Sequence, residues 1–66
     1  MKLSDFTEIE CEYFRRNCNF TPDELEVFNM RAKGYSIVET FMTLNMSEAT
    51  ANRRIKAIKR KILRVL

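Results

Sequence analysis

The basic side chains of this chain gather toward its C-terminal end. Six of its 12 basic residues lie between Ser47 and Ile62, with no acidic residue after Glu48. Arginine can donate two hydrogen bonds to guanine, asparagine can pair with adenine, and lysine neutralises phosphate. Arg53 and Asn52 are therefore candidates for contacts with nucleic-acid bases. A solvated basic face and a basic amphipathic helix on a membrane surface are the alternative interpretations of these residues.

Side chains suited to catalysis or metal binding are scarce. The chain has no His and only two Cys, so nucleophilic triads and metal sites lack their usual components. We expect no enzymatic activity, no metal and no cofactor.

The two cysteines, Cys11 and Cys18, are seven residues apart. On a helix this spacing is about 10 Å along the axis, beyond the Cα separation of about 7 Å that a disulfide allows. We predict two small, buried or half-buried apolar residues instead. Because the sequence shows no signal peptide and no long apolar segment, we expect a cytoplasmic protein with no membrane partner.

Charge is divided unevenly along the chain. Residues 1–26 hold three basic and seven acidic residues, a net charge of −4, whereas residues 27–66 hold nine basic and two acidic residues, a net charge of +7. A polyanion would therefore meet the second half.

Helices must position these residues, because one Gly and one Pro leave little room for a turn-rich β fold. We predict an all-α fold, a small domain of three to four helices that spans residues 1–66, with a helix-turn-helix and a long C-terminal recognition helix. The predicted helices cover about 5–17, 22–33, 37–44 and 48–65.

Capping signals define these helices. Asp5 with Glu8 is the predicted capping pair of the first helix, and Thr21 with Glu24 that of the second, which Gly34 ends. Ser36 with Glu39 begins the third, Asn45 ends it, and Ser47 caps the fourth. The predicted inward-facing residues are Phe6, Ile9, Tyr13 and Phe14, then Leu25, Phe28 and Ala32 with Val27 at the edge, then Ile37, Val38, Phe41 and Leu44.

The last helix has an unbroken apolar stripe with steps of four and three residues, which predicts core positions: Ala51, Ile55, Ile58, Ile62 and Val65. At about 27 Å this helix is longer than the two helices before it can cover. Its second half therefore needs helix 5–17 as a partner, either within the chain or from a second copy in a homodimer. The acidic outer residues of helix 5–17 would then lie near the basic tail, which explains the charge division without nucleic acid.

Two segments, FTPDELEVFNMRAKGYS at 20–36 and LNMSEATANRRIKAIKRKI at 44–62, resemble the LuxR/GerE-type helix-turn-helix and, equally, region 4 of bacterial sigma factors. The matching positions are Phe20, Thr21, Glu24, Val27, Gly34, Ser36, Leu44, Ser47, Thr50, Arg54, Ile58 and Lys61. The resemblance implies a DNA-binding domain. It does not give a role for helix 5–17, since LuxR-type domains carry their further helix after the recognition helix.

Three residues depart from the family pattern. Asn45 replaces the usual turn Gly, which Asn can tolerate, and Ala51 replaces the usual Val. Phe41 occupies a position where the family has a small residue, which predicts that Thr40 faces outward while Phe41 fills the space differently.

The N-terminal half of a recognition helix contacts base edges in the major groove. The predicted base-contacting residues are Glu48, Ala49, Asn52, Arg53 and Lys56, of which the resemblance supports Asn52, Arg53 and Lys56. The predicted phosphate contacts are Ser36, Ser47, Thr50, Arg54, Lys59 and Arg60.

We therefore expect a sequence-specific regulator of transcription from a bacterium or phage, or a sigma-region-4-like module, that binds double-stranded DNA. The alternative is a protein-interaction module of the same fold that docks on RNA polymerase or a sigma factor. Phe41 and the acidic first helix favour that alternative.

Overall fold

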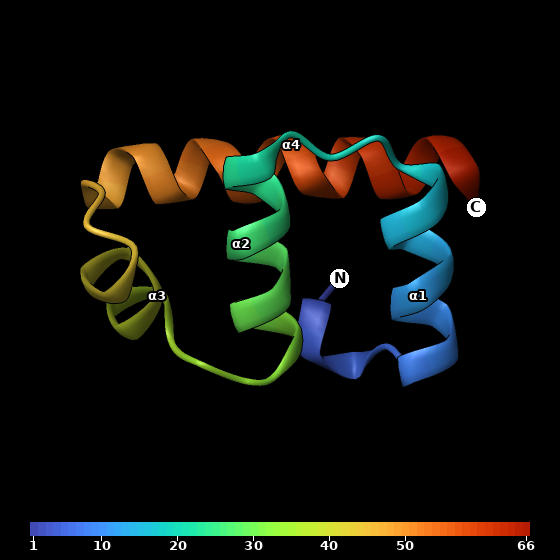
Figure 1. Cartoon of the computed structure of the whole chain (residues 1–66), viewed down its shortest axis with the longest axis horizontal. Helices are drawn as coiled ribbons and strands as arrows, with labels where there is room; N and C mark the ends of the chain where they lie inside the picture. The colour runs from blue at the N-terminus through green and yellow to red at the C-terminus, as the bar shows by residue number, and fades with distance from the viewer.

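Four α-helices and one short 3-10 helix make up the chain in the computed structural model, which describes residues 1–66 and contains no strand. The elements are η1 (Leu3–Asp5), α1 (Glu8–Asn17), α2 (Pro22–Ala32), α3 (Ile37–Thr43) and α4 (Glu48–Val65). The all-α prediction is confirmed. Helix α4 runs along the long axis of the molecule, α1 and α2 run across it, and α3 lies at the end where α4 begins (Figure 1).

The N-terminus of α1 differs from the prediction. The helix begins at Glu8, and its cap is Thr7, whose hydroxyl accepts from the Glu10 backbone N–H at 3.2 Å while Glu10 accepts from the Thr7 N–H at 2.8 Å. The Asp5–Glu8 capping pair is therefore wrong. Asp5 belongs to η1, a turn that places Leu3 in the core.

The buried face of α1 also differs from the prediction. Cys11, Phe14 and Cys18 are buried, whereas the side chain of Ile9 is 84% exposed and Tyr13 is 48% exposed. The inner stripe is thus carried by two cysteines around one phenylalanine. Their predicted burial as free thiols is confirmed, and burial raises the pKa of both thiols.

Helix α2 begins and ends where the sequence indicates. Thr21 and Glu24 form a reciprocal capping box with Pro22 in the first turn. At the other end Gly34 has a φ of 96°, and the N–H of Tyr35 donates to the carbonyl oxygen of Met30 at 3.2 Å, the bond that defines a Schellman cap. Val27, predicted at the edge of the buried stripe, is fully buried with Phe28.

Helix α3 is short, and Ser36 caps it with Glu39 as predicted. Two of its side chains lie opposite to expectation: Val38 is exposed and Thr40 is fully buried. Thr40 tolerates burial because its hydroxyl donates to the carbonyl oxygen of Ser36 at 2.8 Å, so no polar group is left unpaired. Phe41 is half-buried.

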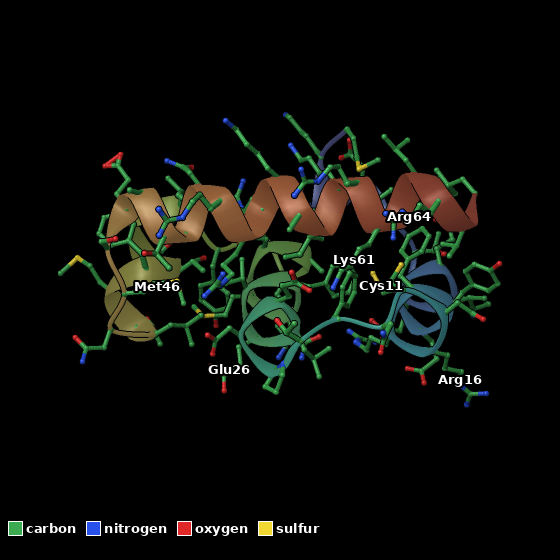
Figure 2. The ribbon with its side chains drawn as sticks, turned by 90° about the horizontal axis from the view of Figure 1, so that it is seen from above. Cys11, Arg16, Glu26, Met46, Lys61 and Arg64 are labelled. Atoms are coloured by element: carbon green, nitrogen blue, oxygen red, sulfur yellow. The ribbon has the colours of Figure 1, made fainter.

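The core joins α1, α2 and α4. Its buried members are Leu3, Cys11, Phe14, Cys18, Val27, Phe28, Ile58 and Ile62. The ring of Phe14 lies edge-on to Phe6 at 4.8 Å and to Phe28 at 6.5 Å between centroids. The second half of α4 is therefore covered by α1 of the same chain. In Figure 2, Cys11 lies between the two helices.

The acidic residues of α1 do not reach the basic tail of α4, contrary to prediction. Two of them pair with Arg15 of the same helix: its guanidinium contacts Glu8 at 3.0 Å and Glu12 at 3.3 Å. The same guanidinium donates a hydrogen bond to the side-chain oxygen of Asn29 in α2 at 2.9 Å. Arg16 adds a second pair with Glu12 at 3.3 Å. The charges of α1 are thus largely balanced within α1.

No helix of the structure combines the length and the apolar character that a membrane span needs.

Candidate nucleic-acid interface

Helix α4 has an apolar inner side and a polar outer side. Ala51, Ile58 and Ile62 are fully buried, and Ile55 and Val65 pack at the edge of the core, so the predicted stripe is confirmed. The predicted base-contacting residues are all exposed on the N-terminal half of the helix: Glu48, Ala49, Asn52, Arg53 and Lys56. We call the exposed side formed by Ala49, Asn52, Arg53, Lys56 and Arg60 the outer face of α4.

The basic residues of α4 fall into two groups. Arg54 pairs with Asp23 at 3.5 Å, and Lys61 pairs with Glu24 at 2.6 Å, both across to the first turn of α2. The others have no acidic partner: Arg53, Lys56, Lys59, Arg60 and Arg64. Figure 2 shows Lys61 directed toward the side of α4 where α2 lies. The unneutralised positive charge of α4 is therefore carried by the residues that form no ion pair with α2.

The Lys61–Glu24 pair fixes α4 on α2. The carboxylate of Glu24 is buried, with 8% of its side chain exposed, and it also accepts from the Thr21 backbone N–H at 3.0 Å. Burial alone raises the pKa of this carboxyl, but the hydrogen bonds from Lys61 and Thr21 outweigh burial and lower it. Lys61 additionally donates to the carbonyl oxygen of Asn19 at 3.1 Å. One lysine thus joins α4 to the α1–α2 connection and to the first turn of α2.

The first turn of α4 is ordered by hydroxyl groups. The Ser47 hydroxyl accepts from the Thr50 backbone N–H at 3.1 Å and donates to the Thr50 hydroxyl oxygen at 2.9 Å. The guanidinium of Arg53 donates to that same oxygen at 3.2 Å. Arg53 is therefore held along the first turn, while its remaining N–H groups stay free to donate.

The turn between α3 and α4 uses Asn45 as predicted. Its φ is 56°, and the N–H of Met46 donates to the carbonyl oxygen of Phe41 at 3.0 Å. Asn45 thus ends α3 in the left-handed conformation, as Gly34 does at the end of α2. The turn is four residues long and brings Ser47 directly to the start of α4.

Four of the six predicted phosphate contacts are already engaged within the protein: the hydroxyls of Ser47 and Thr50 bond to each other, and Ser36 and Arg54 have acidic partners. The amide of Ser36 donates to the Glu39 carboxylate at 2.9 Å, and this hydrogen bond lowers the pKa of Glu39, so a negative charge already lies at the start of α3. Arg54 is half-buried and paired with Asp23. In contrast, Lys59 and Arg60 have no acidic partner.

The two ion pairs from α2 to α4 are absent from the sequence-based expectations. Acidic residues are common in the first turn of a helix, so the presence of Asp23 and Glu24 there needs no distant basic partner to explain it. Their partners lie 31 and 37 positions later in the chain, a separation that no local pattern reveals.

No family model, no curated protein and no solved structure matches this chain.

Proposed function

We propose that the chain binds double-stranded DNA sequence-specifically, with the N-terminal half of α4 in the major groove. One observation carries the proposal: the outer face of α4 presents Asn52, Arg53 and Lys56 exposed and without an acidic partner, while Arg54 and Lys61 of the same helix are paired with α2. Ion pairs to α2 hold one side of α4 in place, so the basic face on its other side is exposed and suited to contact base edges.

The side chains differ in the contacts that they can make. Asn52 suits adenine and Arg53 suits guanine, each by two hydrogen bonds worth about 1–3 kcal/mol of discrimination. Lys56 can donate to a base or to a phosphate. Lys59 and Arg60, further along the helix, supply attraction that does not depend on sequence. Glu48 and Ala49 flank the base-contacting group, and Arg54 contributes to phosphate binding only if it exchanges Asp23 for phosphate.

The resemblance to the LuxR/GerE-type helix-turn-helix and to sigma region 4 supports a role in transcription. It rests on the residues named above, among which the capping and core positions of α2, α3 and α4 have the structural roles that such a pattern needs.

The test is binding of the full chain to random-sequence duplex DNA across a salt series. If four or five phosphates are contacted, log K falls with log salt with a slope of about −4. A response that is flat in salt contradicts the proposal. Sequence selection from a random library then separates two variants: Arg53→Ala loses discrimination at one base position, whereas Lys59→Ala weakens binding to all sequences alike.

A second candidate function is docking on RNA polymerase or a sigma factor. The observation that favours it is an apolar surface around α3, where Tyr35, Val38 and Met42 are exposed. Scattered apolar residues are ordinary on a surface, but Val38 and Met42 are four residues apart on one side of α3, and Tyr35 lies just before the cap of that helix. Retention of polymerase from a nuclease-treated lysate, lost in Val38→Ser and Met42→Ser and kept in Ile9→Ser, supports this function; no retention contradicts it.

A further inference from the structure

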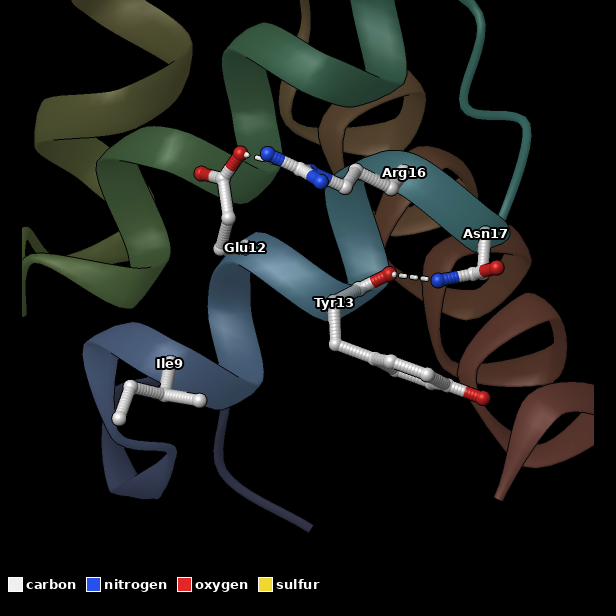
Figure 3. Close-up of a pocket in the computed structure, with 5 residues that line it drawn as sticks. All are labelled: Ile9, Glu12, Tyr13, Arg16 and Asn17. Atoms are coloured by element: carbon white, nitrogen blue, oxygen red, sulfur yellow. Dashed lines mark hydrogen bonds and ion pairs between the residues drawn. The ribbon is translucent and has the colours of Figure 1, made fainter.

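Helix α1 has an outer face that the fold leaves uncovered. A shallow surface depression is lined by Ile9, Glu12, Tyr13, Arg16 and Asn17, all from α1 (Figure 3). We call these five residues the α1 outer face. Ile9 is the most exposed large apolar side chain of the molecule, at 84%, and lies one helical turn from Tyr13. A β-branched apolar residue at such exposure gains nothing from the monomeric fold.

The apolar surface continues onto the end of α4. The Tyr13 hydroxyl donates to the carbonyl oxygen of Val65 at 3.2 Å, which brings the ring against the last turn of α4. Leu66, the next residue, is 75% exposed. Helix α1 and the C-terminal end of α4 lie at the same end of the molecule (Figure 1), and Tyr13 joins them.

Charge along α1 is polarised. Its acidic residues, Glu8, Glu10 and Glu12, occupy the N-terminal half, and its basic residues, Arg15 and Arg16, occupy the C-terminal half. On the α1 outer face this polarity appears as Glu12 and Arg16 beside the two apolar side chains, joined by an ion pair at 3.3 Å. Figure 2 shows Arg16 directed away from α4, into solvent.

We propose that the α1 outer face binds the same face of a second copy of this chain, with the two α1 helices antiparallel. A two-fold axis near Tyr13 makes the patch self-complementary, as a dimer of identical chains requires. The antiparallel arrangement sets the acidic half of one helix against the basic half of the other, so that Glu12 of each copy faces Arg16 of the second copy. Tyr13 then lies between the two charged pairs, and Ile9, which precedes Glu12 by three residues, is covered by the C-terminal end of the second α1 helix near Asn17.

This dimer differs from the one that the sequence suggests. The inner side of α1 and the second half of α4 are buried against each other within one chain, so they are not available to a second copy. The proposed surface uses the opposite side of α1. Because one short helix and the chain end bury less than the roughly 800 Å² per partner of a standard interface, the dimer is weak, with dissociation in the micromolar to millimolar range.

The first experiment is sedimentation of the full 66-residue chain without DNA, from about 10 μM to about 1 mM. We expect the average mass to rise from one chain toward two. Ile9→Ser is expected to raise the dissociation constant at least tenfold, because each dimer buries two Ile9 side chains, one from each copy. The matched control is Val38→Ser, which also removes an exposed β-branched side chain but lies on α3, and is expected to leave association unchanged.

The second experiment reverses the charges. Glu12→Arg alone and Arg16→Glu alone each place like charges across the interface, so each variant is expected to remain monomeric. An equimolar mixture of the two variants restores both opposite-charge contacts and is expected to form a heterodimer. Melting curves of the separate variants verify that each is folded.

Several outcomes overturn the proposal. These are a wild-type chain that stays monomeric to about 1 mM, an Ile9→Ser variant that associates like wild type, or charge variants whose mixture fails to associate. Because no DNA is present, these results do not depend on the proposed DNA binding.

Discussion

Replacing Lys61 with methionine is expected to destabilise the fold. The ammonium of Lys61 donates to the Glu24 carboxylate at 2.6 Å and to the carbonyl oxygen of Asn19 at 3.1 Å. Methionine keeps an apolar stem of similar length, but it leaves the buried carboxylate with the N–H of Thr21 as its main donor. Hydrogen bonds to charged groups contribute about 1.5–3 kcal/mol, and because one quarter of the lysine side chain is exposed, we expect the lower half of that range.

Thermal and urea unfolding measure this effect. A loss of about 1.5–2 kcal/mol lowers the melting temperature of a chain of this size by roughly 6–15 °C. The matched control is Lys56→Met, because Lys56 is exposed and has no acidic partner, and it is expected to change stability by less than about 0.5 kcal/mol. In the double variant Lys61→Met/Glu24→Gln, the loss should be smaller than the sum of the single losses, since the two side chains interact. Equal effects of Lys61→Met and Lys56→Met, or additive single losses, would refute the reasoning.

Three further predictions concern other parts of the molecule. Phe14→Ala empties the centre of the aromatic cluster and should cost about 3–5 kcal/mol in urea unfolding, or prevent folding altogether. The free energy of unfolding should fall as the pH drops below about 5, because the pKa of Glu24 is lowered in the fold and its stabilisation is lost as the pH falls through that value; in Glu24→Gln this fall should be smaller. Asn45→Gly should stabilise or leave unchanged the α3–α4 turn, whereas Asn45→Val should destabilise it by about 1–2 kcal/mol, since a φ of 56° strains a β-branched residue.

Local chemistry predicts three of the four helices well. Thr21, Ser36 and Ser47 begin their helices as expected, because each cap satisfies backbone groups within three or four residues of itself. The α1 cap is missed because Asp5–Glu8 and Thr7–Glu10 have the same spacing. In the structure Leu3 is buried and Asp5 belongs to η1 with it, so Asp5 does not cap α1. Leu3 belongs to no periodic apolar pattern, and its burial depends on tertiary packing that the local sequence does not indicate.

Long-range placement accounts for the remaining differences. Nothing near Glu24 in the sequence indicates Lys61 as its partner. The sequence predicts burial for both Ile9 and Cys11, and only the packing of α1 in the fold shows that Cys11 is buried while Ile9 is exposed. Thr40 shows the same limit: its local hydrogen bond to Ser36 makes burial tolerable, but only the packing of α3 makes it occur. The candidate outer face of α4 follows from the sequence more directly, because helical periodicity with an unambiguous buried stripe leaves one side for the polar residues.

The salt dependence of DNA binding tests the central proposal most directly. The measurement compares wild type with Lys59→Met, and with Lys61→Met at a temperature where that variant is folded, on duplex DNA between 50 and 200 mM salt, the range over which phosphate-contacting proteins lose affinity steeply. The proposal predicts a steep slope for wild type, a slope smaller by about 0.9 for Lys59→Met, and an unchanged slope for Lys61→Met, whose ammonium is held by Glu24. A wild-type affinity independent of salt, or a slope that Lys59→Met leaves unchanged, would contradict it.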